Sequence, residues 1–309
     1  MPQRATYYFG RVIKLGTVTS SSLLQALREP PNVRVGDFVY TITNAQVAGA
    51  AAAPRYVYAT LTKYTPEGAI AVVEPSAHRE ALADVQNLVV ASSPFIYLPE
   101  YSGIAYQHIW NKLQREQFER AFSAIIEERH GRFFAQSFIE PISNLATFVS
   151  RISALSQITK IEATVHPPNP LFGRSWAGLR EYMRVRRTSE VHVREVALPE
   201  ESLQTSVPQI ASSLQGTTEG EASRTLAPLG NYDSMFADAA VLMAADGYGK
   251  ARVEGQRAGR RVVVRTLDSQ VSEQIEREIE PEMLYERVRP IFARISEDRY
   301  MEHSSEEGP

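Results

Sequence analysis

The sequence predicts an α+β fold, and three patterns along the chain support it. Residues 1–110 consist of short segments that alternate apolar and polar residues between turn-forming residues, as in antiparallel β structure. Residues 133–197 alternate strand-like and helix-like segments in the order β-α-β-α-β. Residues 250–266 form a late hairpin pattern. We expect an N-terminal curled antiparallel β domain with short helices, then an α/β (ferredoxin-like) layer, a late β-hairpin and a C-terminal helix.

The N-terminal β domain is expected at residues 1–110. Thr19 precedes a run of serines and can cap a short helix through Arg28, because its hydroxyl can accept a hydrogen bond from a free backbone amide. Pro66-Glu67-Gly68 combines residues typical of turns, so the segment that follows is expected to pair back as a hairpin. Strands are predicted at 6–13, 38–43, 56–64, 69–73, 95–98 and 104–109.

An α/β domain is expected at residues 111–205, beginning with an amphipathic helix at 112–126. Its central strand ends at His166-Pro167-Pro168-Asn169-Pro170, because the three prolines lack the amide donor that a strand ladder needs. An arginine-rich helix follows this corner. The predicted strands are 133–139, 158–165 and 190–197, and the predicted helices are 142–155 and 174–186.

The last third of the chain is expected to contain a connection and a final structured region. Residues 206–230 are rich in Ser, Thr and Gly, which predicts a flexible connection. Residues 231–309 are expected to form a helix to Ala245, a tight Asp246-Gly247-Tyr248-Gly249 turn and a hairpin. A charged helix at 271–297 and a disordered acidic tail complete the prediction.

Composition excludes several classes of protein. A content of 43% hydrophobic and 22% charged residues is ordinary for a folded soluble chain. No stretch of about 18 apolar residues occurs, and the N-terminus shows no apolar signal core, so a cytoplasmic location is expected. The absence of cysteine excludes disulfides, thiolate zinc sites and cysteine nucleophiles. The six histidines do not fall at metal-ligand spacing, and no nucleotide-binding loop is present, so we predict neither metal nor cofactor.

The formal net charge of −3 is unevenly distributed. Residues 268–309 hold 12 acidic and 5 basic residues, a balance of −7, so the rest of the chain carries +4. Only five of the 33 basic residues are lysine, a bias that a GC-rich genome explains equally well. Two clusters concentrate the positive charge: six arginines at 171–194 and six basic residues at 250–265. Such clusters point to a polyanion, although a charged run is more often a solvated surface.

The two clusters give a candidate nucleic-acid site. In the predicted helix at 174–186, Arg180, Arg184 and Arg187 follow the spacing i, i+4 and i+7 and would present guanidinium forks to successive phosphates. Arg174 near the helix start would add a fourth contact. The hairpin would form a second site that tracks a nucleic-acid backbone or enters a groove, and its residues are Lys250, Arg252, Arg260, Arg261 and Arg265. DNA is the expected partner, with the double-stranded form favoured.

Two other interpretations remain open. In the first, acidic residues neutralise the arginines within the fold or across a dimer, which would make the chain an interaction or oligomerisation module. The acids expected in that role are Glu181, Glu273, Glu276, Glu278 and Glu280. In the second, the chain is a nuclease with an unrecognised site around Lys160, Glu162, His166 and His192, of which Lys160 and Glu162 share one strand face.

Several segments resemble a group of prokaryotic proteins. Lys160-Ile161-Glu162, Pro168-Asn169-Pro170 and Asp246-Gly247-Tyr248-Gly249 resemble a signature of proteins found near phage-defence genes. The order of parts is similar to the cytosolic component of the Rex exclusion system and to the DNA-binding subunit of Kiwa defence. The resemblance implies a non-enzymatic, DNA-binding sensor or effector subunit of an anti-phage system. It also implies a membrane-embedded defence partner, and we expect a homodimer or higher homo-oligomer.

Overall fold

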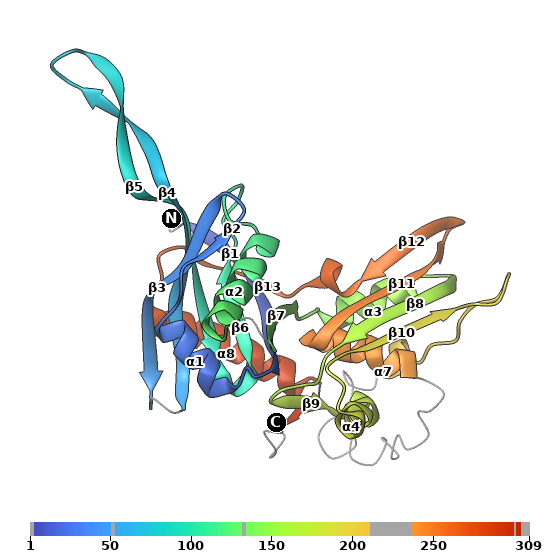
Figure 1. The fold of residues 1–309 in the computed structure, drawn as a ribbon. Helices are drawn as coiled ribbons and strands as arrows, with labels where there is room; N and C mark the ends of the chain where they lie inside the picture. Colours follow the sequence, from blue (N-terminus) through green and yellow to red (C-terminus); the bar gives the residue numbers. More distant parts are fainter. Residues whose placement is uncertain (1–2, 51–52, 132–133, 211–235, 300, 304–309) are drawn as a thin grey trace.

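The larger sheet has helices packed on both of its faces, and its strands contribute buried side chains to each face (Figure 1). It is antiparallel, in the order β13-β1-β6-β5-β4-β3-β2, and β7 also pairs with β1. Its strands are β1 (Arg4–Gly16), β2 (Val33–Val35), β3 (Phe38–Gly49), β4 (Pro54–Glu74), β5 (Arg79–Leu98), β6 (Gly103–Gln107), β7 (Ala135–Pro141) and β13 (Ser272–Glu276). The computed structural model describes residues 3–50, 53–131, 134–210, 236–299 and 301–303, and it confirms the α+β class.

Helices cover both faces of this sheet. On one face lie α1 (Ser20–Arg28) and α2 (Arg115–Arg129), which bury Leu23 and Phe122 against the strands. On the other face lies α8 (Pro281–Glu297), which buries Phe292. The predicted cap of the first helix is confirmed, because Thr19 Oγ1 accepts a hydrogen bond from the backbone amide of Ser22 at 3.1 Å.

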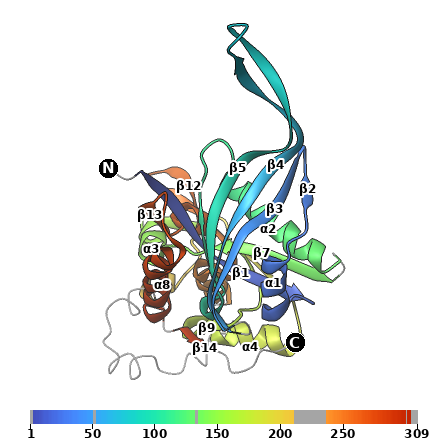
Figure 2. The same ribbon diagram turned by 90° about the vertical axis from the view of Figure 1, so that its left-hand side faces the viewer.

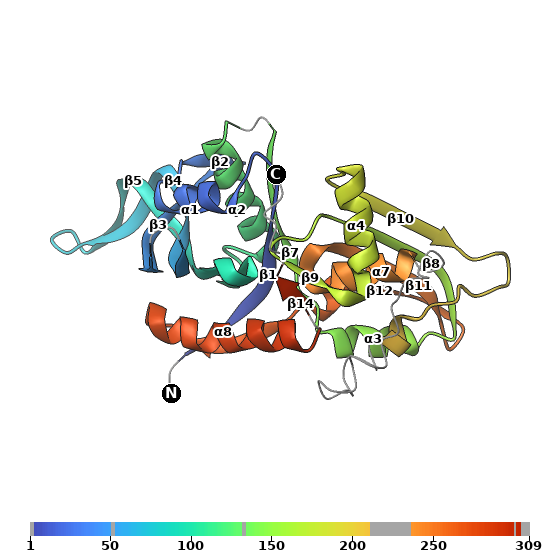
Figure 3. The same ribbon diagram turned by 90° about the horizontal axis from the view of Figure 1, so that it is seen from below.

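The smaller sheet is antiparallel in the order β10-β8-β11-β12. Three helices, α3, α4 and α7, bury their apolar residues against one of its faces (Figures 1 and 3). The elements are α3 (Leu145–Ser153), β8 (Gln157–Val165), α4 (Ala177–Arg186), β10 (Val191–Val196), α7 (Phe236–Met243), β11 (Gly249–Arg257) and β12 (Arg260–Arg265). Two short strands, β9 (Leu171–Gly173) and β14 (Met301–His303), pair with each other beside this layer. Short helical turns are η1 (Pro99–Tyr101), η2 (Arg174–Trp176), η4 (Ala244–Tyr248) and η5 (Thr266–Ser269).

The Asp246-Gly247-Tyr248-Gly249 turn joins the two sheets. Gly247 has a φ of +89° and Gly249 a φ of +155°, and a Cβ on Gly249 would lie 2.0 Å from the carbonyl oxygen of Thr164. The carboxylate of Asp246 accepts hydrogen bonds from Arg299 Nη1 at 2.6 Å and from Trp176 Nε1 at 2.7 Å. The backbone oxygen of Asp246 accepts one from Arg11 Nε of β1 at 2.8 Å. Side chains from three distant parts of the chain therefore converge on one buried acid.

The predicted hairpin turn at Pro66-Glu67-Gly68 is wrong. Strand β4 continues through it to Glu74, and the turn lies at residues 75–78. A Cβ on Gly68 would lie 2.8 Å from Cδ2 of Leu88 on the paired strand, so the Leu88 side chain occupies space that the glycine leaves open. Strands β4 and β5 consequently form a long two-stranded arm that projects from the body of the molecule (Figure 2).

Other predicted boundaries also differ. The single helix expected at 271–297 is two elements, because β13 pairs with β1 and α8 begins only at Pro281, a residue suited to the first helical position. Residues 301–303, expected to be disordered, form β14. The strand expected at 133–139 is β7, which pairs with β1 of the larger sheet rather than with the smaller sheet. Most of the connection expected at 206–230 lies outside the described residues, which resume at 236.

Two segments outside the expected N-terminal domain belong to the larger sheet. Residues 111–141 supply α2 and β7 to the larger sheet, and residues 272–297 supply β13 and α8 to it. The chain therefore returns to its N-terminal sheet after completing the smaller one.

Candidate nucleic-acid interface

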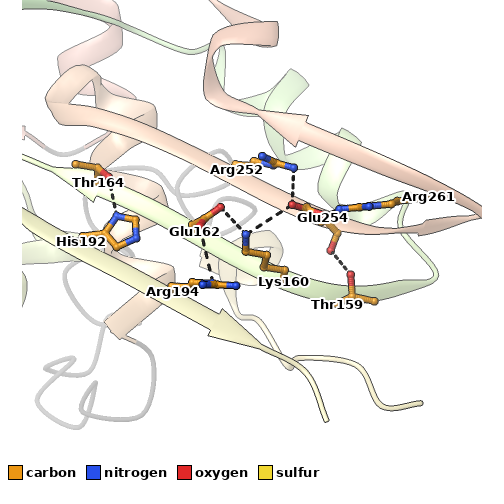
Figure 4. A network of polar contacts seen from close by, with 9 residues as sticks. All are labelled: Thr159, Lys160, Glu162, Thr164, His192, Arg194, Arg252, Glu254 and Arg261. Carbon is orange, nitrogen blue, oxygen red and sulfur yellow. Dashed lines mark hydrogen bonds and ion pairs between the residues drawn. The ribbon is translucent and has the colours of Figure 1, made fainter. Parts of the chain in front are cut away.

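The face of the smaller sheet opposite its helices is lined by polar and charged side chains. Antiparallel strands place directly paired residues on the same face, and alternate residues on opposite faces. One face buries Ile161, Ala163 and Val253 against the helices. The residues between them therefore lie on the other face, which we call the open face (Figure 4). Alternation therefore separates the polar residues of these strands from the apolar ones.

Strand register arranges the charges of the open face in rows. One row crosses all four strands, from Arg194 through Glu162 and Arg252 to Arg265. A second row pairs Lys160 of β8 with Glu254 of β11. The open face carries six cations and two carboxylates. The cations are Lys160, Arg194, Lys250, Arg252, Arg261 and Arg265, and the carboxylates are Glu162 and Glu254.

Glu254 is the anionic centre of the open face. Its side chain is only 4% exposed, and its carboxylate lies 2.6 Å from Arg252 Nη2 and 3.9 Å from Lys160 Nζ. Arg261 Nε donates a hydrogen bond to it at 3.1 Å. The hydrogen bond from Arg261 and the neighbouring cations lower the pKa of Glu254. The acid is therefore ionised at neutral pH and forms ion pairs with Arg252 and Arg261.

Glu162 has a similar role one row away. Its carboxylate lies 2.8 Å from Lys160 Nζ and 3.9 Å from Arg194 Nε. The hydrogen bond from Lys160 lowers the pKa of Glu162, as do the charges of Lys160, Arg194 and Arg252. Two ionised carboxylates thus face six cations, and the excess of positive charge remains at the surface. Arg194 is 60% exposed and is available to an external anion.

The two halves of the predicted site lie on different faces of the smaller domain. Helix α4 buries Leu179 and Met183 in the core beneath the sheet, on the side opposite to the open face. Its arginines therefore cannot join those of the hairpin in one surface. Arg187 does not continue the predicted helical row, because α4 ends at Arg186 and Arg187 is its C-cap, with a left-handed φ of +52°.

The other three arginines of the predicted site on this helix, Arg174, Arg180 and Arg184, have partners within the chain. Arg174 contacts Glu302 of β14, with a hydrogen bond from Nε at 2.7 Å. Arg180 lies over the ring of Phe172, at 4.2 Å from the centroid. Arg184 donates to Glu181 at 2.7 and 2.8 Å, and this hydrogen bonding lowers the pKa of Glu181. These contacts make the helix a weaker anion site than its spacing predicted.

The acids that bind arginines differ in part from those expected. Glu181 does contact Arg184, as the interaction-module interpretation required. The other acids bound to arginines of the predicted site are Glu254 and Glu302. Glu273 and Glu276, which were expected in this role, lie instead in β13 at the side of β1. They lie there because residues 272–276 form strand β13, where the start of the C-terminal helix was predicted.

Within the hairpin, the five predicted residues take different positions. Arg252, Arg261 and Arg265 lie on the open face, as does Lys250, whose Nζ is 3.6 Å from Glu140 Oε1. Arg260 is exposed at the β11–β12 turn, where Ala258 and Gly259 both have positive φ. The structure therefore places these residues along one ribbon, as the pattern indicated.

The residues of the nuclease interpretation are only partly brought together. Lys160, Glu162 and His192 share the open face, and His192 Nδ1 lies 2.9 Å from Thr164 Oγ1. His166 is separate from them, because it is buried, with its ring stacked on Phe138. Among the residues with described positions, no group of three or more His, Asp or Glu side chains is arranged to hold a metal ion.

Two residues of the site were missed by the sequence pattern. Arg194 falls within the arginine cluster at 171–194 but outside the predicted helix, and the alternation His192-x-Arg194 in a strand is the pattern that places it on an exposed face. Glu140 of β7 is buried beside Lys250, and its Oε2 atom has no hydrogen-bond partner among the described residues. Burial raises the pKa of Glu140 to about 7. No local pattern could have predicted this contact, because it joins two sheets.

Comparisons with known proteins place the chain in a family. No curated protein matches the chain. Within the described residues, no helix combines the length and the apolar character needed to cross a membrane. A family model described as a domain of unknown function, DUF4747, matches residues 23–226, about two thirds of the chain. The match runs from α1 past β10 and stops before the hairpin that completes the open face. The chain belongs to the DUF4747 family.

Proposed function

We propose that this protein binds duplex DNA through the open face of its smaller sheet, as a non-enzymatic sensor or effector subunit of a prokaryotic anti-phage defence system. The observation that supports DNA binding is that six cations on the open face outnumber the acids beside them, which are Glu162, Glu254 and the neighbouring Glu140 of β7. Arginine forks in rows suit the repeated phosphates of a nucleic-acid backbone.

The composition of the open face favours a duplex over a single strand. Proteins that hold single strands without sequence preference stack bases on aromatic side chains. The open-face positions of β8, β10, β11 and β12 carry no Phe, Tyr or Trp, and their apolar members are Val196 and Val263. Contacts to the phosphate backbone would therefore dominate binding, with little readout of base sequence.

The role in defence is supported by the resemblance of the Lys160-Ile161-Glu162, Pro-Asn-Pro and Asp-Gly-Tyr-Gly segments. The family description gives no function, so this role remains a prediction. A membrane-embedded partner is part of the same proposal. The test is to infect three kinds of cells with phage: cells with the gene, cells without it and cells with an open-face variant. Equal plaque numbers for cells with and without the gene would contradict the defence role.

A salt series tests DNA binding directly. Binding of a short duplex is measured by fluorescence anisotropy at increasing salt, and the logarithm of the affinity should fall linearly with the logarithm of salt concentration. The double variant Arg194→Glu with Arg265→Glu should weaken binding and make the salt slope shallower by about 2, since each lost phosphate contact removes about 0.9. Failure of the wild-type protein to bind any nucleic acid at low salt would end the proposal.

The predicted helix supplies a matched control. Arg184→Glu with Arg187→Glu makes the same change in net charge on the other side of the smaller domain. This variant should retain the affinity and the salt slope of the wild type. If it loses binding while the open-face variant keeps it, the site lies on α4. Competition by single-stranded DNA and by duplex RNA of equal length shows whether the protein prefers duplex DNA, single-stranded DNA or RNA.

Hydrolysis of nucleic acid is a second candidate. The observation that favours it is the placement of Lys160, Glu162 and His192 on the same open face, with Lys160 and Glu162 in contact at 2.8 Å. Incubation with plasmid and with RNA, each with and without magnesium, tests it. Cleavage that disappears in Glu162→Gln but persists in Glu181→Gln would replace the non-enzymatic proposal.

A further inference from the structure

The arm formed by residues 66–87 of β4 and β5 is a two-stranded ribbon without further strand partners among the described residues. Pairing of β4 with β3 ends at Tyr64, and pairing of β5 with β6 begins at Phe95. Beyond these points β4 and β5 pair only with each other and project away from the body (Figures 1 and 2). An isolated two-stranded hairpin is only marginally stable in water. The arm is therefore expected to gain stability by being covered.

Strand register divides the arm into two faces of different character. On the apolar face, three successive pairs contain only apolar residues or glycine: Gly68 with Val85, Ile70 with Ala83, and Val72 with Ala81. On the acidic face, each of the four successive pairs except Ala71 with Leu82 contains an acid: Glu67 with Gln86, Ala69 with Asp84, and Val73 with Glu80. The solvated side of such a ribbon is the one that carries its charges, so the apolar face is the one to be covered.

Charge identifies the occupant of the apolar face. The arm contains four acids and one arginine, which would repel a nucleic acid. The charges on the apolar face are Glu74 and Arg79 at the tip, which pair with each other at 2.6 Å and leave that face neutral. A neutral apolar face can meet an identical face without repulsion, while the three acids of the acidic face point outward into water.

The sizes of the side chains support the same occupant. In each of the three apolar pairs a large residue lies opposite a small one, so the face has raised and lowered positions. A two-fold axis near the central pair, Ile70 and Ala83, would place the large side chains of one copy against the small residues of the other. Such an isologous arrangement is the commonest symmetry of soluble oligomers. We infer that the arms of two copies of this chain pack against each other through their apolar faces to form a dimer.

Sedimentation velocity of the full-length chain without nucleic acid tests the inference. The wild type should show a monomer–dimer equilibrium with increasing concentration. Ile70→Lys with Val72→Lys should shift it to monomer, because four like charges would then meet at the two-fold axis. The matched control is Val73→Lys with Leu82→Lys on the acidic face, where Leu82 is 77% exposed against 40% for Ile70. This control should remain dimeric although it removes more exposed apolar side chains.

The absence of cysteine permits a second measurement that does not depend on disrupting the arm. Because Ala83 of one copy would face Ile70 of the other, oxidation of an equal mixture of the variants Ala83→Cys and Ile70→Cys should yield a disulfide-linked dimer of the two. Ala69→Cys on the acidic face should remain uncross-linked. A wild type that stays monomeric at all concentrations, or cross-linking of Ala69→Cys equal to that of the mixture, would overturn the inference. DNA binding of the arm variants is measured separately. A protein that does not dimerise can therefore still bind DNA through the open face, and a protein that does not bind DNA can still dimerise.

Discussion

Two clusters of arginine and carboxylate in this molecule differ in how much of their charge reaches solvent. At the junction of the sheets, Arg11 and Arg299 are buried, and Arg299 pairs with the carboxylate of Asp246, which is also buried. On the open face, Glu254 is buried but its partners Arg252 and Arg261 are 40% and 73% exposed. The comparison shows that the depth of the guanidinium, rather than the presence of an ion pair, separates a structural arginine from one available to a ligand.

The largest expected effect is at the junction. Asp246→Ala should destabilise the protein by about 3–5 kcal/mol, because it leaves the buried Arg299 without its counter-charge and Trp176 Nε1 without its acceptor. Burial already lowers the pKa of Arg299, which indicates the cost of holding this cation away from water. Urea unfolding followed by circular dichroism measures the loss. A loss below about 1 kcal/mol would show that the junction is hydrated and that the comparison is mistaken.

The next effect depends on pH and concerns Glu140, which lies between the two regions. Its pKa in the folded protein, about 7, exceeds its ordinary value of 4.5, so the folded state holds the proton more tightly. The stability that this proton provides is complete below pH 4.5 and is lost as the pH rises through about 7. Glu140→Gln should therefore stabilise the protein at pH 8, by at most about 3 kcal/mol, and change little near pH 4.5.

Glu162→Gln is the control for this pH dependence. The pKa of Glu162 is lowered in the folded protein, so its ionised form adds stability above the ordinary pKa, which is lost as the pH falls through the folded value. Thermal melting across pH 4–8 should show opposite signs for the two variants. The same sign for both would mean that Glu140 is ionised in the folded state.

A smaller effect is expected at the centre of the open face. Glu254→Gln removes a buried acceptor of arginine hydrogen bonds and should cost about 1 kcal/mol of stability, since its arginine partners can turn to solvent. The same change releases Arg252 and Arg261 for external phosphates and should tighten DNA binding, with a steeper salt dependence. Weaker DNA binding with unchanged stability would show that Glu254 positions the cations rather than competing for them.

The smallest effect is expected on α4. Arg184→Ala breaks a solvent-exposed contact with Glu181, and exposed pairs of this kind contribute little to stability. The melting temperature should not change measurably at 0.15 M salt, a typical physiological ionic strength. A clear decrease would mean that α4 is a structural charge cluster like that of the junction.

Sequence patterns predicted local structure well and long-range structure poorly. Alternation in 158–165 and the turn-flanked hairpin gave β8, β11 and β12 nearly in full, so the hairpin part of the candidate site was found. The pairing of β13 with β1 could not be found, because Ser272–Glu276 is a short polar strand held by a partner more than 250 residues away. The arm was missed because Pro66 and Gly68 have turn chemistry that cross-strand pairing overrides. Which face each arginine occupies followed only from tertiary structure.

The Asp246 junction also has a consequence for the biogenesis of the protein. Its parts come from β1, from the turn before β11 and from the residue Arg299, which follows α8. During synthesis, the N-terminal sheet and the smaller sheet can begin to form while Arg299 is still inside the ribosome. The ion pair with Asp246 can form only after Arg299 has emerged, so this junction is completed late in synthesis.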